Sequence, residues 1–271
     1  GGSWKMQIVG ENVYGIAQED IPAVIPGSVY GNLLSQGLIP DPYDGMNELT
    51  ALKLMENDFR FLTTFILTRE QMESDFLLLR FDGIDTLADI YLNDILIGHA
   101  DNMHRVWEFN LEEAAREGEN ALRVEIASPT RFIEAENQKV YTGGSTDSMR
   151  GFPHLRKAHC MFGWDWGPRL PDAGIFREVS VLSGNKARLE QVYITQDWNR
   201  QNRDAVDAVT QENQKATDAK QQKNGKTDSV TIQFAVTVED FVTEEKELED
   251  YEIRIALYDD QGCLVGEKTS A

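Results

Sequence analysis

The stretch Ala88-Asp89-Ile90-Tyr91-Leu92-Asn93-Asp94-Ile95-Leu96-Ile97-Gly98-His99 decides the fold class of this 271-residue chain. Apolar and polar side chains alternate up to the turn residues, and a second apolar run follows them. Asn and Asp tolerate the left-handed backbone that a two-residue hairpin turn requires. The stretch therefore predicts two antiparallel β-strands joined at Asn93-Asp94.

Short strand-like runs of the same kind surround this hairpin. They are rich in β-branched or aromatic residues and lie at 59–67, 76–81, 106–111, 121–127 and 177–182. Helices are predicted only at 29–36, with Ser28 as N-cap and Gly37 as the residue after the helix, and at 112–117 and 130–139. Many short strands without regular strand–helix alternation predict an all-β fold, with an antiparallel sandwich or jelly roll over residues 1–184.

A second β domain is predicted over residues 185–271. Its strand-like runs are at 189–195, 230–238 and 251–258, fewer than the seven or so strands of a free-standing immunoglobulin-like sandwich. This domain is therefore either truncated or completed by strands from elsewhere. Residues 200–228 are almost entirely polar, so we expect a polar insertion that buries too little apolar surface to pack.

Composition and charge exclude several classes of partner. A formal net charge of −20 disfavours binding to nucleic acid and to anionic membranes, and no apolar run is long enough to span a bilayer. The first residues have no signal-peptide pattern. Cys160 and Cys263 are far apart in sequence, and we expect two free thiols in a reducing, cytoplasmic compartment.

The most specific chemical pattern is Trp164-Asp165-Trp166, in a segment that flanking glycines and prolines keep out of helices and central strands. Sugars stack their C–H faces on indole rings, and a carboxylate accepts hydrogen bonds from their hydroxyl groups. Gly163 and Gly167 would let the backbone approach such a ligand. The alternative is a structural corner, in which both tryptophans anchor the core and the aspartate caps a turn.

Other candidate residues do not form a recognisable catalytic or metal site. His154, His159 and Cys160 match no common zinc spacing, so packing or hydrogen bonding is the preferred interpretation, and no metal or cofactor is expected. Asp82 and Asp85 follow a strand, and their spacing predicts turn capping. Glycosidases need a pair of carboxylic acids, but with 46 acidic residues the sequence alone selects no pair.

Several motifs in order make residues 4 to about 195 resemble the N-terminal region of a β-mannosidase of glycoside hydrolase family 2. The strand–Leu-Asn–strand element is shared across family 2, whereas Trp-Asp-Trp-Gly-Pro is typical of the β-mannosidase branch. The matching residues are Trp4, Ile-Pro-Gly-Ser-Val-Tyr at 25–30, Asp-Pro-Tyr at 41–43, Asn-Glu at 47–48, Phe-Asp-Gly-Ile-Asp-Thr-Leu-Ala-Asp-Ile-Tyr-Leu-Asn at 81–93, Arg-Lys at 156–157 and Phe-Gly-Trp-Asp-Trp-Gly-Pro at 162–168.

The resemblance implies a jelly-roll, galactose-binding-like domain, then an immunoglobulin-like sandwich in which this chain stops, then a (β/α)8 barrel. The barrel would hold both catalytic glutamates of a retaining exo-β-mannosidase, so no catalytic residue is expected in this chain. Its implied partners are that missing C-terminal barrel and a β-mannoside oligosaccharide. The resemblance further implies that Asp165 binds hydroxyls of the terminal β-D-mannose, with Trp164 and Trp166 beside it. Under this resemblance, Asp82 and Asp85 are still expected to be residues that cap a turn.

Three other functions stay open on the sequence. The jelly roll would also suit a stand-alone carbohydrate-binding module. It would suit another family 2 glycosidase, similar to a β-galactosidase or β-glucuronidase. Finally, it would suit a purely structural domain that supports a barrel.

Overall fold

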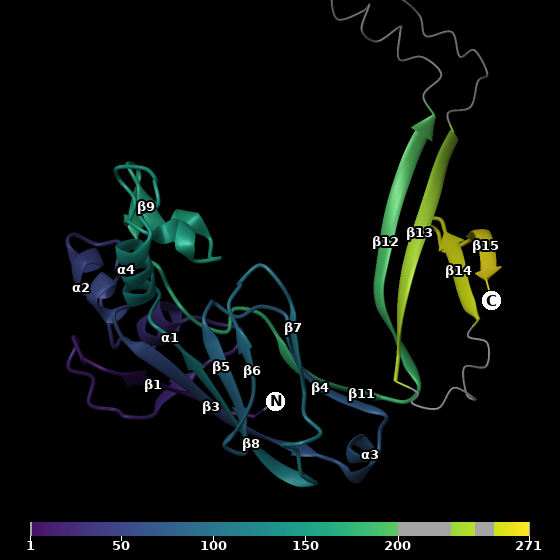
Figure 1. The fold of residues 1–271 in the computed structure, drawn as a ribbon, viewed down its shortest axis with the longest axis horizontal. Helices are drawn as coiled ribbons and strands as arrows, with labels where there is room; N and C mark the ends of the chain where they lie inside the picture. The colour runs from purple at the N-terminus through teal and green to yellow at the C-terminus, as the bar shows by residue number, and fades with distance from the viewer. Residues whose placement is uncertain (1, 200–228, 242–251, 271) are drawn as a thin grey trace, which may run out of the picture. The chain divides into compact units, whose positions relative to one another are not determined.

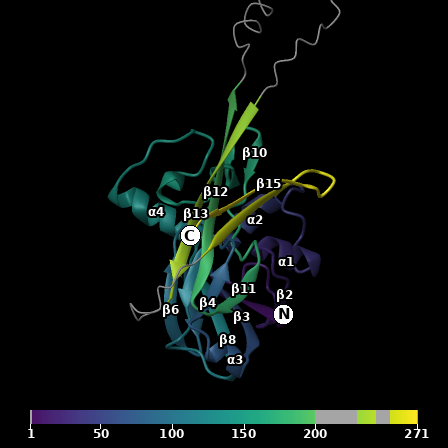
Figure 2. The same ribbon diagram turned by 90° about the vertical axis from the view of Figure 1, so that its right-hand side faces the viewer.

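The computed structural model describes residues 2–199, 229–241 and 252–270. The chain divides into two compact units, Gly1–Asn185 and Lys186–Ala271, which Figures 1 and 2 show from two sides. The polar insertion predicted at 200–228 lies outside the described residues. Within the described part of the chain, no helix is long and apolar enough to cross a membrane.

The first unit is built on a six-stranded antiparallel sheet. Its strands, in spatial order, are β2 (Ile21–Ala23), β1 (Trp4–Val9), β3 (Asp58–Leu67), β8 (Gly118–Ile126), β5 (Ala88–Leu92) and β6 (Ile95–Ala100). Along β8 and β5 the side chains alternate between buried and less buried positions, which is the pattern of strands with one face on a core. The strands β1 and β2 have no counterpart among the predicted runs.

A three-stranded sheet supplies the other half of the core. It consists of β11 (Val179–Gly184), β4 (Phe76–Phe81) and β7 (Trp107–Asn110), all antiparallel. Phe81 of β4 and Phe109 of β7 meet edge to face at 6.1 Å. They share one buried cluster with Phe59 and Phe61 of the larger sheet. Two sheets around a common apolar core confirm the all-β prediction.

The hairpin at Asn93-Asp94 is confirmed. Strands β5 and β6 pair antiparallel with Leu92 opposite Ile95, and both turn residues have positive φ, 50° at Asn93 and 67° at Asp94. Two successive left-handed residues give the turn a twist that matches its strands. Gly37 also has a positive φ of 67° and follows helix α1 (Val29–Ser35), whose N-cap Ser28 accepts a hydrogen bond from Gly31. Both predicted caps are confirmed.

The remaining helices lie between strands. They are α2 (Asn47–Leu54), α3 (Arg69–Met72), α4 (Pro129–Lys139) and the 3₁₀ turns η1 (Phe152–His154) and η2 (His159–Met161). Helix α4 confirms the prediction for 130–139, whereas α2 and α3 were not predicted.

The helix predicted at 112–117 is wrong, since these residues form a turn and a bend. Two asparagine side chains outside this segment bind its backbone groups instead: Asn93 of the β5–β6 turn donates to the Ala114 carbonyl at 2.8 Å, and Asn120 of β8 accepts from the Arg116 amide at 3.0 Å. A helix needs those groups for its own hydrogen bonds.

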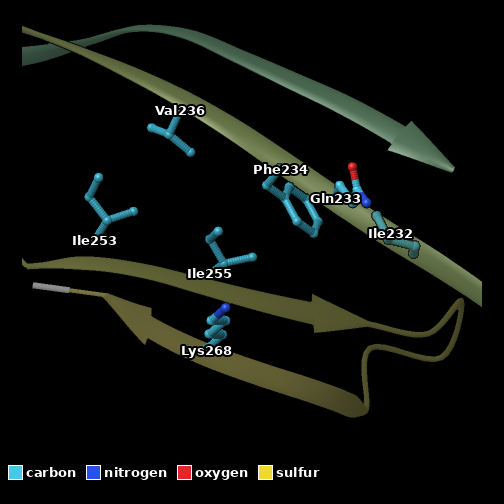
Figure 3. Close-up of a pocket in the computed structure, with 7 residues that line it drawn as sticks. All are labelled: Ile232, Gln233, Phe234, Val236, Ile253, Ile255 and Lys268. Carbon is cyan, nitrogen blue, oxygen red and sulfur yellow. The ribbon is translucent and has the colours of Figure 1, made fainter.

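The second unit contains two antiparallel hairpins. One pairs β12 (Ala187–Asn199) with β13 (Ser229–Asp240), and the other pairs β14 (Ile253–Tyr258) with β15 (Leu264–Ser270). Apolar side chains of β13 and β14 point into the space between the hairpins (Figure 3), which forms a cavity of about 480 Å³. The cavity is lined by Ile232, Gln233, Phe234, Val236, Ile253, Ile255 and Lys268. The strands predicted in this region are confirmed, and β15 was not predicted.

Candidate functional site

Trp164, Asp165 and Trp166 form the tip of a short hairpin in the first unit. Strand β9 (Phe162–Trp164) pairs antiparallel with β10 (Gly167–Arg169), with Trp164 opposite Gly167. Asp165 and Trp166 are therefore the two residues of the turn. The hairpin is a separate two-stranded sheet, and it lies at the same end of the unit as α2 and α4, away from α3 (Figures 1 and 2).

The three side chains of the tip face solvent. Trp164 is 50% exposed, Trp166 is 81% exposed, and Asp165 is exposed as well. No hydrogen bond or ion pair from the Asp165 carboxylate reaches another residue of the described ranges. The structural alternative, in which the tryptophans anchor the core, is therefore wrong. Two exposed indole rings and an exposed carboxylate thus stand together at the tip.

Phe162 anchors the base of the hairpin. Its side chain is fully buried and packs in a small cluster with Ile133 of α4 and Leu155, separate from the main core. The Phe152 ring lies 6.0 Å from the Phe162 ring. Gly163, whose φ is +95°, stands between Phe162 and Trp164, and the Trp164 side chain is 50% exposed. The buried Phe162 thus anchors the strand whose last residue is half exposed.

Arg169 ties the second strand to its surroundings. Its backbone amide donates to Glu48 Oε1 of α2 at 2.8 Å, and its guanidinium donates to the Asp147 carbonyl at 2.9 Å. Gly163 has a φ of +95°, and a Cβ atom there would stand 2.6 Å from Arg169 Cγ. The expectation that Gly163 leaves room for a ligand is wrong, because the Arg169 side chain fills that space.

Gly167 differs from Gly163. The nearest atom to a Cβ at Gly167 is 4.0 Å away, and its φ is not positive. The hairpin therefore needs glycine at 163 for its own backbone and packing, while position 167 has free space beside it.

The histidines and the cysteine before the hairpin have structural contacts. His154 Nε2 lies 2.8 Å from the Val140 carbonyl, and the His159 ring meets the Phe152 ring edge to face at 4.8 Å. Cys160 is a free, exposed thiol. Over the described ranges, no three metal-ligating side chains gather at one point.

The interpretation of Asp85 as a capping residue is wrong. Its carboxylate is buried and forms an ion pair with Lys157, whose side chain has no exposed surface. Asp82 instead pairs with Arg80 at 2.7 Å near the surface. Burial lowers the pKa of the Lys157 ammonium, because the charged form loses its hydration, while Asp85 opposes this effect.

A pocket of about 370 Å³ opens beside the hairpin. Pro168 and Leu170 line one side, and Tyr30 of α1 and Tyr43 line another. Asp172 also borders it, and burial raises the pKa of its carboxyl group. The carboxyl group accepts hydrogen bonds from the amides of Tyr30 at 3.1 Å and Ala173 at 2.8 Å. This pocket is mostly apolar, and the Asp172 carboxyl group already accepts hydrogen bonds from the protein backbone.

The sheets and the exposed tip define a β-sandwich domain with loops gathered at one end. A family model described as "Glycosyl hydrolase 2 galactose-binding domain-like" matches residues 4–177. The chain belongs to this family.

Several of the relatives of this chain are β-mannosidases. β-Mannosidase from Mus musculus is 31% identical over 203 residues, which is 72% of this chain and 22% of that protein. β-Mannosidase B from Aspergillus clavatus is 34% identical over 163 residues, 58% of this chain and 19% of its own. The crystal structure of β-D-mannosidase from Dictyoglomus thermophilum is 36% identical with a TM-score of 0.65, covering 72% of this chain and 23% of that one.

A fold likeness extends over the second unit. A β-glucuronidase structure from Bifidobacterium dentium covers 99% of this chain and 38% of its own, with a TM-score of 0.58 and 21% identity. At this identity the match concerns the fold alone. The chain spans about a fifth of the length of the curated β-mannosidases that it matches.

Proposed function

We propose that this chain is the substrate-recognition part of a retaining exo-β-mannosidase that hydrolyses terminal β-D-mannose residues. Asp165 accepts hydrogen bonds from hydroxyl groups of the terminal sugar, and Trp164 and Trp166 border that sugar with their ring faces. The observation that carries this proposal is the solvent-exposed tip, whose carboxylate has no hydrogen-bond or ion-pair partner among the described residues. The β-mannosidase relatives support the choice of sugar.

The chemistry of the tip suits binding rather than bond cleavage. A retaining glycosidase needs two carboxyl groups about 5 Å apart, one acting as acid and the other as nucleophile. The tip carries a single carboxylate between two indoles. We therefore assign the catalytic pair to a barrel domain of the same polypeptide outside this sequence, and we expect the 271-residue chain alone to show no β-mannoside hydrolysis.

Kinetics of Asp165→Ala in the complete polypeptide test the assignment. A charged hydrogen bond that tightens in the transition state is worth about 2–4 kcal/mol in kcat/KM, which corresponds to a loss of about 30- to 1000-fold. Asp101→Ala removes another exposed carboxylate and serves as the matched control. Nearly unchanged turnover in Asp165→Ala would instead favour a purely structural domain.

A stand-alone carbohydrate-binding module is the second candidate. The exposed rings of Trp164 and Trp166 favour it, because such modules bind glycans on exposed aromatic surfaces. Titration of the 271-residue chain with mannobiose, followed by NMR, separates the two functions. Binding at millimolar affinity or tighter that Asp165→Ala abolishes would favour the module. Absence of binding would favour a site that only the barrel completes.

A cytoplasmic location is part of the proposal. Cys160 and Cys263 are both exposed free thiols, which suits a reducing compartment. Fractionation of the native host, with a thiol-labelling reagent applied before lysis, would test it. Labelled cysteines in an extracellular fraction would contradict this location.

A further inference from the structure

Lys157 occupies an unusual position for a lysine. Its side chain is fully buried in the first unit, and its ammonium group pairs with the buried Asp85 carboxylate. The same nitrogen donates a hydrogen bond to the backbone carbonyl of Asp172. The buried Lys157 ammonium thus connects the Asp85 side chain to the Asp172 carbonyl.

The two ends of the hairpin segment meet at this ammonium. Lys157 directly precedes residues 158–171, which contain β9 and β10, and Asp172 directly follows them. The clamp therefore closes the base of the loop that carries the tip.

Asp85 connects the clamp to the sandwich. It lies between β4 and β5, and its backbone exchanges two hydrogen bonds with Gly174, at 2.8 and 3.0 Å. The clamp therefore holds the base of the loop against the connection between the two sheets. Gly174 follows Asp172 by two residues, so Asp85 holds the chain next to the end of the loop.

Burial of an ion pair is a poor source of net stability. Removing both charges from water costs about as much as their attraction returns, and well-packed apolar replacements are often as stable. A buried pair restricts geometry, however, because neither charge can leave its partner. The main effect of this pair is therefore to fix the position of the two ends of residues 158–171, and not to add net stability.

We propose that Lys157 is a positioning residue for the Trp164-Asp165-Trp166 tip. By closing residues 158–171 at both ends and fixing them to Asp85, it sets the direction in which the tip leaves the sandwich. This inference rests on the proposed function, because the tip must reach a sugar for its direction to matter.

The test uses Asp85→Leu combined with Lys157→Met, which replaces the pair with apolar side chains of similar size. Lys157→Met alone would leave a buried unpaired carboxylate. In the 271-residue chain labelled with 5-fluorotryptophan, the ¹⁹F resonances of Trp164 and Trp166 should narrow and move toward those of free indole. Resonances of the half-buried Trp4 and Trp107 should stay in place as internal controls for the fold. Unchanged Trp164 and Trp166 resonances would overturn the proposal.

Values of kcat/KM for the complete polypeptide distinguish positioning of the tip from a general structural role. The double replacement should lower kcat/KM about 10-fold when Asp165 is present, but less than about 2-fold in the Asp165→Ala background, since coupled residues are not additive. Equal losses in both backgrounds would contradict positioning through the tip. If Asp165→Ala alone has no effect, the proposed function fails, and the ¹⁹F experiment alone decides on the clamp.

Should the double replacement unfold, which Trp4 and Trp107 would report, Asp85→Asn combined with Lys157→Met is the second variant. It removes both charges, and asparagine keeps the size of the side chain at position 85. The Trp164 and Trp166 resonances should narrow in this variant as well. Resonances identical to those of wild type would overturn the proposal in that case.

Discussion

Two hairpins of the first unit end in two-residue turns that contain an aspartate, yet their side chains serve different purposes. At Asn93-Asp94 the asparagine donates to the Ala114 carbonyl and to Asn120 Oδ1, both at 2.8 Å, and accepts from the Ala121 amide at 3.0 Å. At Asp165-Trp166 the side chains are exposed and make no such hydrogen bond to any of the described residues. The side chain of Asn93 in the first turn stabilises the fold, whereas the side chains of the second turn are exposed to solvent and available to a ligand.

The contrast gives a physical criterion for a functional turn. A turn whose polar groups are satisfied inside the protein lowers the free energy of the folded state and has nothing left for a ligand. A turn that holds two tryptophans and a carboxylate in water gains little from folding, so its residue types need another explanation. Substitutions at the two turns should therefore affect different measurements.

Asn93→Ala should produce the largest loss of stability. It removes three hydrogen bonds and puts alanine, which tolerates the left-handed conformation less well than asparagine, at a φ of 50°; together these effects cost about 3 kcal/mol. Urea unfolding of the 271-residue chain, followed by near-ultraviolet circular dichroism, measures the change. Asn93→Gly is the matched control: it tolerates positive φ and should lose about 2 kcal/mol from the hydrogen bonds alone. Equal stability of wild type and Asn93→Ala would break the comparison.

Gly163→Ala should cost about 2 kcal/mol of stability, because alanine is strained at a φ of +95° and its Cβ would collide with Arg169 Cγ. Gly167→Ala provides the control in the same hairpin, since position 167 has open space. We expect it to change the free energy of unfolding by less than about 0.5 kcal/mol. Thermal unfolding of both variants checks the prediction. Equal costs at the two positions would show that the hairpin does not constrain its glycines differently.

Asp172→Asn, at the base of the hairpin that carries Trp164-Asp165-Trp166, should change how the stability of the protein depends on pH. Burial raises the pKa of the Asp172 carboxyl group above its ordinary value of 3.8. The folded state therefore binds the proton more tightly, and this contribution to stability is full below pH 3.8 and is lost as pH rises through the folded pKa. Between about pH 4 and pH 7, wild type should lose stability relative to Asp172→Asn. Melting temperatures of both proteins across that range measure the difference, and a constant difference would contradict the raised pKa.

Local chemistry explains which parts of the fold could be predicted. The turn at Asn93-Asp94 and the caps Ser28 and Gly37 depend on backbone preferences of single residues, so the sequence shows them directly. The false helix at 112–117 has ordinary helical spacing. The helix does not form because Asn93, 21 residues before Ala114, and Asn120 of the following strand bind its backbone groups.

The sequence predicts the type of site, but not the residues that hold it in place. Trp164-Asp165-Trp166 indicates a sugar-binding composition, whereas no local pattern shows that Phe162 anchors the hairpin in an apolar cluster with Ile133 of α4. The ion pair of Asp85 with Lys157 joins residues 72 positions apart, and no local pattern distinguishes such a lysine from a surface one. Its only signal in the sequence was membership of an Arg-Lys pair within the resemblance.

Asp165→Ala should have the smallest effect on stability. The carboxylate is exposed and has no partner within the described ranges, so its removal should change the free energy of unfolding by less than about 0.5 kcal/mol. The same substitution should strongly impair mannoside turnover in the complete polypeptide. Urea unfolding alongside Asn93→Ala measures the first effect under identical conditions. A loss comparable to that of Asn93→Ala would mean that Asp165 supports the hairpin, and the distinction between a turn used by the fold and a turn presented by it would fail at this residue.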